Sequence, residues 1–164
     1  MAVAAIVAFE LHEFGHKMTN SKEDTMTEFP GGKIVVPIDC SDESLAAVDV
    51  ALDIAGNASN LTVVHVLPDH HEHDLLADAI DHAKRRGLVE EALRRRFDDP
   101  QHRLLNVEVT FGDPGHRIAE VAELRHAKLI VMPSRGRAGI KRLLIGSVAE
   151  RVVRLAHCPV LVLR

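Results

Sequence analysis

The chain has 164 residues, with 46% hydrophobic and 27% charged side chains and a formal net charge of −4. One domain with a buried core fits this composition, whereas the negative charge and an aromatic content of 3% argue against nucleic-acid binding through charge attraction or base stacking. Two cysteines make no disulfide framework and favour a reducing cytoplasm, and no apolar stretch is long enough to span a membrane.

The first 32 residues are interpreted as an extension and linker, and residues 33–164 as the domain. The extension opens with the apolar run "MAVAAIVAF" and ends in "TNSKEDTMTEFPGG", whose Pro-Gly-Gly ending is typical of a linker. We expect a short helix over Ala2–Leu11. Residues 1–32 are expected to be poorly ordered or not native, and because Met26 stands shortly before the first strand of the domain, the hypothesis is that residues 1–25 are upstream sequence from a misplaced start.

The extension also contains a match to a zinc-peptidase motif. His12, Glu13 and His16 fit H-E-x-x-H, in which two histidines of one helix hold zinc and the glutamate activates water. The His and Glu frequencies of this chain give roughly a 5% chance of such a match somewhere in it. The motif also lies before the linker and outside the strand–helix pattern that follows. A zinc peptidase therefore stands as an alternative and not as the main prediction.

From Lys33 onward, short β-branched runs alternate with helical periodicity. Ser41 is a suitable N-cap for the first helix, and Gly56 with Asn57 a suitable stop. Pro114 lies close to the first turn of the third helix, where its missing N–H does no harm. Strands are predicted over 33–38, 60–66, 104–111, 128–132 and 159–163, and the other helices over 74–97 and 147–157. This βαβαβαβαβ order, with strands too apolar to face water, predicts an α/β fold: a parallel sheet with helices on both faces.

The loop after the fourth strand is the most informative of those that follow the strands. It reads "PSRGRAGIKRLLIGS" over residues 133–147, with three glycines and four basic residues before a helix. Glycines let backbone N–H groups turn inward, and a helix N-terminus carries partial positive charge, so the loop suits phosphate. Two structural roles remain open: Ser147 and Glu150 fit a capping box, and the arginines fit a solvated surface.

The loop after the first strand, "VPIDCSDES", supplies the second half of this prediction. Asp39 stands at the carboxyl end of the strand, where it can accept hydrogen bonds from a ribose or an adenine edge; its alternative role is to cap the next helix beside Ser41. That helix begins with Asp42 and Glu43, which would repel phosphate. A nucleotide is therefore expected to place its nucleoside near Asp39 and its phosphates near 134–147.

These segments resemble the universal stress protein family. The resemblance rests on "KIVVPIDCSDES", "VVHVLP" and above all "IVMPSRGRAGIKRLLIGSVAERVVRLAHCPVLVLR", and it covers residues 33–164. It implies a Rossmann-like fold of the adenine-nucleotide-hydrolase type, a five-stranded sheet of order 3-2-1-4-5, and dimers formed largely through the last strand. In many members it also implies bound ATP or another adenine nucleotide.

The family fingerprint, Gly-x-x-Gly, nine residues and Gly-Ser or Gly-Thr, maps onto this chain with one departure. Gly136, Gly146 and Ser147 match it, but Pro133 replaces the first glycine and removes its N–H and its flexibility. Cys40 stands where glycine is frequent. The predicted nucleotide-binding residues are Pro37, Ile38, Asp39, Ser41, Val66, Met132, Ser134, Arg135, Gly136, Arg137, Gly146, Ser147 and Val148.

The main prediction is a cytoplasmic stress-response protein that binds ATP or another adenine nucleotide, with or without Mg, and that at most hydrolyses it slowly. It is expected to form a homodimer through Pro159–Leu163, because "PVLVL" would otherwise be an exposed apolar edge. No nucleic acid or membrane is expected as a partner. The alternatives are a dimerisation module without a ligand and a metal-binding protein. Besides His12 and His16, the metal candidates are His70, His71 and His73, in a tract most simply explained as a solvated loop.

Overall fold

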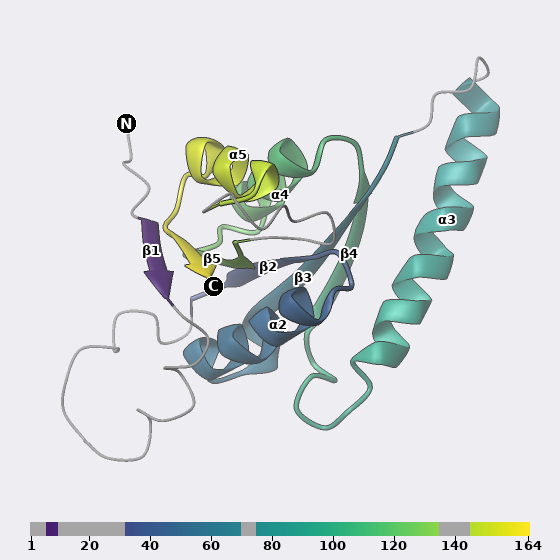
Figure 1. Cartoon of the computed structure of the whole chain (residues 1–164). Coiled ribbons are helices and arrows are strands. Elements are labelled where there is room, and N and C mark those ends of the chain that lie inside the picture. Colours follow the sequence, from purple (N-terminus) through teal and green to yellow (C-terminus); the bar gives the residue numbers. More distant parts are fainter. Residues whose placement is uncertain (1–5, 10–31, 70–74, 135–144) are drawn as a thin grey trace.

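Six parallel strands form one sheet in the order β1-β6-β5-β2-β3-β4 (Figure 1). The computed structural model describes residues 6–9, 32–69, 75–134 and 145–164. The strands are β1 (Ile6–Phe9), β2 (Ile34–Ile38), β3 (Leu61–Leu67), β4 (Asn106–Phe111), β5 (Leu129–Pro133) and β6 (Val160–Leu163). The helices are α2 (Asp42–Ala55), the 3₁₀ turn η1 (Ala58–Asn60), α3 (Leu75–Arg96), α4 (Pro114–Leu124) and α5 (Ser147–Leu155). The five strands predicted from the sequence are confirmed, and counted without β1 they have the predicted order 3-2-1-4-5.

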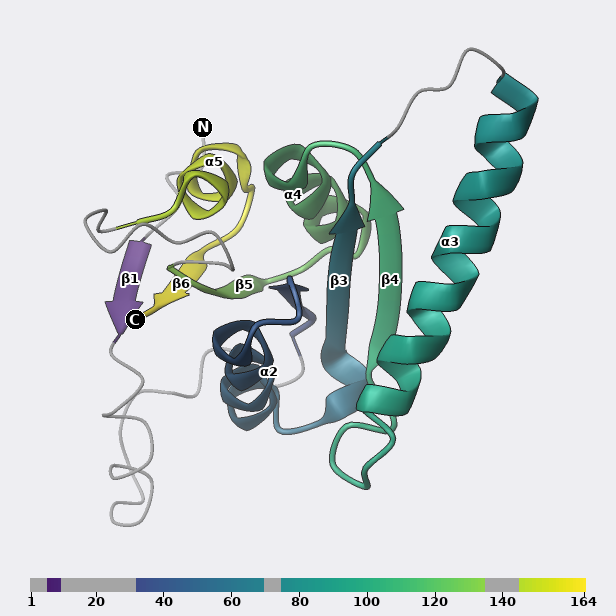
Figure 2. The ribbon, with the colours of Figure 1, turned by 45° about the vertical axis from the view of Figure 1, so that its right-hand side comes forward.

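The sheet is buried on both faces, as its apolar strands predicted. Along β2, Ile34 and Val36 belong to a core with α2 and the end of α3, whereas Val35 belongs to a second core with α4 and α5. Figure 2 shows α4 and α5 on one side of the sheet, α2 on the other, and α3 alongside the edge strand β4. Alternate residues of each central strand therefore pack into two separate cores, one on each face of the sheet.

The predicted turn signals at the helix ends are confirmed. Ser41 is the N-cap of α2, where its hydroxyl oxygen accepts a hydrogen bond from the N–H of Ser44 at 3.3 Å. Gly56 ends α2 with φ of 65°, in the left-handed region that glycine adopts without strain. Pro114 occupies the first turn of α4. These local signals therefore determine where α2 begins and ends and where α4 begins.

The helix predicted over Ala2–Leu11 is wrong where the structure describes it, because Ile6–Phe9 form a strand. This strand, β1, pairs in parallel with β6, with Ile6 opposite Val160 and Phe9 opposite Leu163. A short isolated helix is marginal in water, whereas the edge of a sheet offers a row of backbone groups that a β-branched segment can pair with. Pairing with β6, from the other end of the chain, therefore determines the conformation of Ile6–Phe9, and not the helix that the local sequence predicted.

Candidate functional site

The carboxyl ends of β2 and β5 meet at the point where the strand order reverses. β2 pairs with β3 on one side and with β5 on the other, so the connections from β2 to β3 and from β5 to β6 leave in opposite directions along the sheet. In an open parallel sheet this reversal leaves a crevice outside the strand ends, and ligands bind there. The loop after Ile38 and the start of α5 both border this edge (Figure 2).

Asp39 is held in place by the turn that follows β2. Its Oδ1 accepts hydrogen bonds from the backbone N–H of Ser41 at 3.0 Å and from the Ser41 hydroxyl at 2.5 Å. Cys40, between them, has φ of 63°, a conformation that costs a non-glycine residue free energy. Asp39 therefore supports the N-cap residue Ser41 and does not itself cap α2, which was its predicted structural alternative. The same bonds hold the half-buried carboxylate of Asp39 at the end of β2.

The neighbouring strand β3 is tied to the end of β2 by a histidine. Nδ1 of His65 lies 2.8 Å from the carbonyl oxygen of Ile38, a distance that fits donation of its ring N–H to that oxygen. The prediction that His65 is a satisfied structural residue is confirmed by this bond. Val66, the next residue, is partly exposed near the end of β3. This hydrogen bond ties the end of β3 to the end of β2 at the same edge of the sheet as Asp39.

The start of α5 differs from those of α2 and α4, since no side chain makes a capping hydrogen bond there. Gly146 is the N-cap, with φ of −77° and ψ of 158°, and Ser147 is the first helical residue. The predicted capping box led by Ser147 is therefore wrong by one position, because a box needs its serine at the N-cap. The N–H of Gly146 donates to the carbonyl oxygen of Ser134 at 2.7 Å, which fixes the helix start to the end of β5.

The predicted nucleotide-binding residues that the structure describes fall into three groups by their exposure to solvent. Four are buried at or beside the strand ends: Pro37, Ile38, Met132 and Ser134. Four are partly exposed around the edge: Asp39, Ser41, Val66 and Gly146. Ser147 and Val148 are exposed in the first turn of α5. The exposed and partly exposed residues border the surface at this edge of the sheet, and the buried residues lie beneath them.

Several predicted residues lie outside the described part of the chain. These are Arg135, Gly136 and Arg137 of the glycine-rich loop and the histidines His12, His16, His70, His71 and His73. Within the described ranges, no group of three or more His, Cys, Asp or Glu side chains is placed to hold a metal ion. Among the helices described there, none has the length and apolar character needed to cross a membrane.

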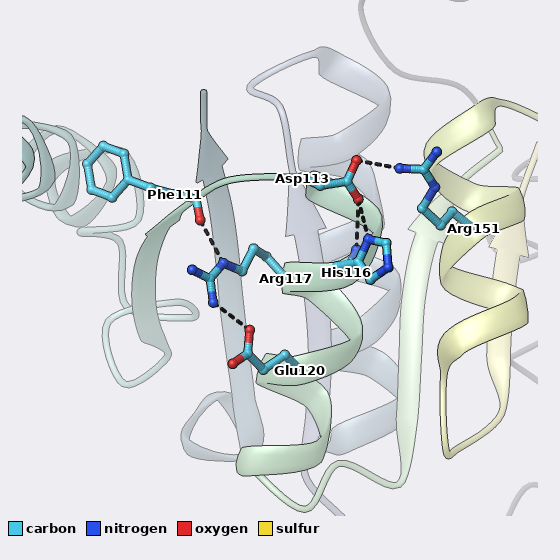
Figure 3. Close-up of polar contacts among 6 residues, drawn as sticks. All are labelled: Phe111, Asp113, His116, Arg117, Glu120 and Arg151. Carbon is cyan, nitrogen blue, oxygen red and sulfur yellow. Dashed lines mark hydrogen bonds and ion pairs between the residues drawn. The ribbon is translucent and has the colours of Figure 1, made fainter. Parts of the chain in front are cut away.

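Sequence reasoning missed a polar cluster at the starts of α4 and α5 (Figure 3). Asp113 caps α4: its Oδ1 accepts from the N–H of His116 at 3.1 Å and lies 2.9 Å from Nδ1 of the same residue. Its Oδ2 pairs with the Arg151 guanidinium of α5. Gly115 permits this approach, because a Cβ there would lie 2.5 Å from the Arg151 side chain. An aspartate directly before a proline at a helix start was the available signal for the cap, but not for its partner.

These hydrogen bonds give the Asp113 carboxyl an acid-sensitive role in stability. Bonds from the His116 side chain, the His116 backbone and Arg151 hold the pKa of Asp113 well below its usual range. Its contribution to stability is therefore complete above the unfolded-state pKa of about 4, and it is lost as the pH falls toward the lower folded-state pKa. We expect the free energy of unfolding to fall more steeply below about pH 4 in the native chain than in Asp113→Asn, which keeps a capping oxygen. Urea denaturation at a series of pH values measures both curves, and parallel curves would contradict this assignment.

Comparison with known proteins gives a consistent result. Residues 32–164 match the universal stress protein family. A universal stress protein of Methanocaldococcus jannaschii is 38% identical over 143 residues, which cover 80% of this chain and 81% of that protein. The structure of UspA from Lactobacillus plantarum has a TM-score of 0.64 at 28% identity and covers 82% of this chain and 99% of its own. A universal stress protein solved in complex with cAMP has a TM-score of 0.59 at 28% identity, with 81% and 97% of the two chains covered.

Proposed function

The chain belongs to the universal stress protein family, and we propose that it binds an adenine nucleotide between the carboxyl ends of β2 and β5. In this proposal the protein acts in the stress response by binding the nucleotide, with ATP as the leading ligand. The observation that carries the proposal is the start of α5, which is hydrogen-bonded to the end of β5 and has no side-chain cap. A helix N-terminus of this kind favours a phosphate group.

The charges around the edge support one orientation of the ligand. α2 starts with Asp42 and Glu43, whereas the first turn of α5 has Glu150 as its acidic residue. The N-termini of α2 and α4 are already capped by Ser41 and Asp113. Phosphates would therefore be repelled by the acidic residues at the start of α2. At α4 the Asp113 carboxylate already occupies the helix N-terminus, whereas the start of α5 would favour a phosphate. The nucleoside would lie on the side of Asp39 and Val66.

The residues at the edge fit the parts of a nucleotide by their chemistry. The Asp39 carboxylate accepts hydrogen bonds, as two ribose hydroxyls require. The backbone N–H groups of Ser147 and Val148 lie in the first turn of α5, where the helix leaves N–H groups available for an anion. The similar protein solved with cAMP supports an adenine nucleotide as the ligand class. A Mg ion, a cytoplasmic location and a homodimer through Pro159–Leu163 remain predictions from the sequence.

Isothermal titration calorimetry with ATP, ADP, AMP and cAMP tests the proposed function. We expect saturable heat for at least one of these nucleotides, and GTP serves as the comparison that tests the preference for adenine. No heat from any adenine nucleotide at millimolar concentration would overturn the proposal. That result would favour the alternative from the sequence, a module that folds in the same way and binds no nucleotide.

A further inference from the structure

The last strand of the domain is covered by a segment from the start of the chain. β1 (Ile6–Phe9) lies parallel to β6, in register along all four residues of β6 (Figures 1 and 2). The other edge of β6 pairs with β5, where Val160 lies opposite Ile130 and Leu163 opposite Pro133. A strand has two hydrogen-bonding edges, so β6 has no edge left for a further strand while β1 is in place.

β1 does not belong to the unit shared with the family. The family match begins at residue 32, and the five strands β2–β6 with their helices lie within it. Without β1, the sheet would end at β6, whose four residues are all buried apolar side chains with at most 8% exposed surface. A fully apolar edge strand with unpaired backbone groups is a template for another chain, and proteins cover or blunt such edges. In this chain β1, which lies outside the family match, covers the edge of β6.

We propose that β1 is a guard strand that competes with a second copy of the chain for the edge of β6. With β1 paired, the edge is closed and the chain is a monomer. When β1 leaves, two copies associate through their β6 edges, so the N-terminal segment controls self-association. The proposal deepens the predicted homodimer through Pro159–Leu163 and is independent of nucleotide binding.

The two states exclude each other because they use the same backbone groups. Either β1 or β6 of a second copy can pair with the open edge of β6. β1 has the advantage of a high effective concentration, because it belongs to the same chain. A second copy has no such advantage, but it offers a complete strand of four apolar residues, its own β6, for pairing. The equilibrium between the monomer and the dimer should therefore depend on how strongly β1 pairs with β6. Substitutions in β1 that remove a backbone N–H can weaken this pairing without changing residues 32–164.

The test uses the full chain with Val7→Pro and Ala8→Pro combined. Proline cannot donate a strand hydrogen bond, and of two adjacent residues in a strand one directs its N–H toward β6. The matched control, Val7→Thr with Ala8→Thr, changes both side chains but keeps both N–H groups and places a strand-favouring β-branched residue at each position. Sedimentation velocity over a range of protein concentrations gives the self-association constant of each chain, and far-UV circular dichroism establishes that each is folded.

We expect the proline variant to self-associate about tenfold more tightly than the native chain, which is the shift expected from weakening one or two hydrogen bonds, and the threonine control to match the native chain. Amide exchange gives a second readout: at low concentration, the outward-facing N–H groups of β6 should exchange faster in the proline variant. Equal association constants for the native and proline chains would overturn the proposal. A native dimer that the prolines dissociate would overturn it too, because β1 would then pair with β6 of another copy. Neither result depends on the calorimetry with nucleotides.

Discussion

Replacing Asp39 with Ala is expected to weaken the binding of ATP and of adenosine by the same factor, roughly 10- to 100-fold. The carboxylate lies at the carboxyl end of β2, and a hydrogen bond from a ligand hydroxyl to a charged acceptor contributes about 1.5–3 kcal/mol. Adenosine has the ribose but no phosphate, so both ligands lose the same contact. Isothermal titration calorimetry with the two ligands measures both factors.

The matched control for Asp39 is Asp42→Ala, which removes a carboxylate three residues later, from the first turn of α2. The side chain of Asp42 is exposed, and the proposed nucleoside contacts do not include it. We expect the affinity for adenosine to be unchanged and that for ATP to be unchanged or slightly higher, because one negative charge is lost. A loss equal to that of Asp39→Ala would mean that the start of α2, and not the Asp39 contact, determines binding.

Replacing Ser147 with Pro is expected to weaken ATP binding about tenfold and to leave adenosine binding unchanged. Proline removes both the hydroxyl and the backbone N–H of the first residue of α5, the groups proposed to meet phosphate. The fold should tolerate the change, because proline is favoured at the first position of a helix and Gly146 already has the extended ψ of 158° that a following proline requires. Calorimetry with ATP and adenosine compares the two losses.

Ser147→Ala separates the two groups that proline removes together. If the backbone N–H carries most of the phosphate contact, the alanine variant should lose clearly less ATP affinity than the proline variant. Unchanged ATP binding in Ser147→Pro would remove α5 from the site. An equal loss for ATP and adenosine would place the nucleoside, and not the phosphates, at the start of α5, which reverses the proposed orientation.

The two-sided α/β fold could be predicted because its signals are local. Each buried strand shows as a short apolar run, and Ser41, Gly56 and Pro114 carry the turn chemistry that places helix ends. The predicted start of α5 at Ser147 is confirmed, but the capping-box alternative assigned the N-cap to Ser147, whereas the structure has Gly146 there, bonded to Ser134.

The features that could not be predicted depend on residues far apart in the sequence. β1 pairs with a strand more than 150 residues away, and a four-residue apolar segment shows no period that distinguishes a strand from a helix. The pair of Asp113 and Arg151 joins two helices that are separate in sequence. The sequence analysis did not use the local signal for the Asp113 cap, an aspartate directly before Pro114, and no local signal marks Arg151 as its partner, because the close approach of Arg151 to Gly115 brings the guanidinium within reach.

Amide chemical shifts of the ¹⁵N-labelled chain during a titration with ATP test most directly whether a nucleotide binds between β2 and β5. The account predicts that the largest shift changes occur at Asp39–Ser41 after β2 and at Gly146–Val148 at the start of α5, with Val66 also affected. Amides at the opposite end of the sheet, such as those of Gly56 and Asn60, should remain unchanged. No saturable changes at millimolar ATP, or changes confined to the opposite end, would contradict it.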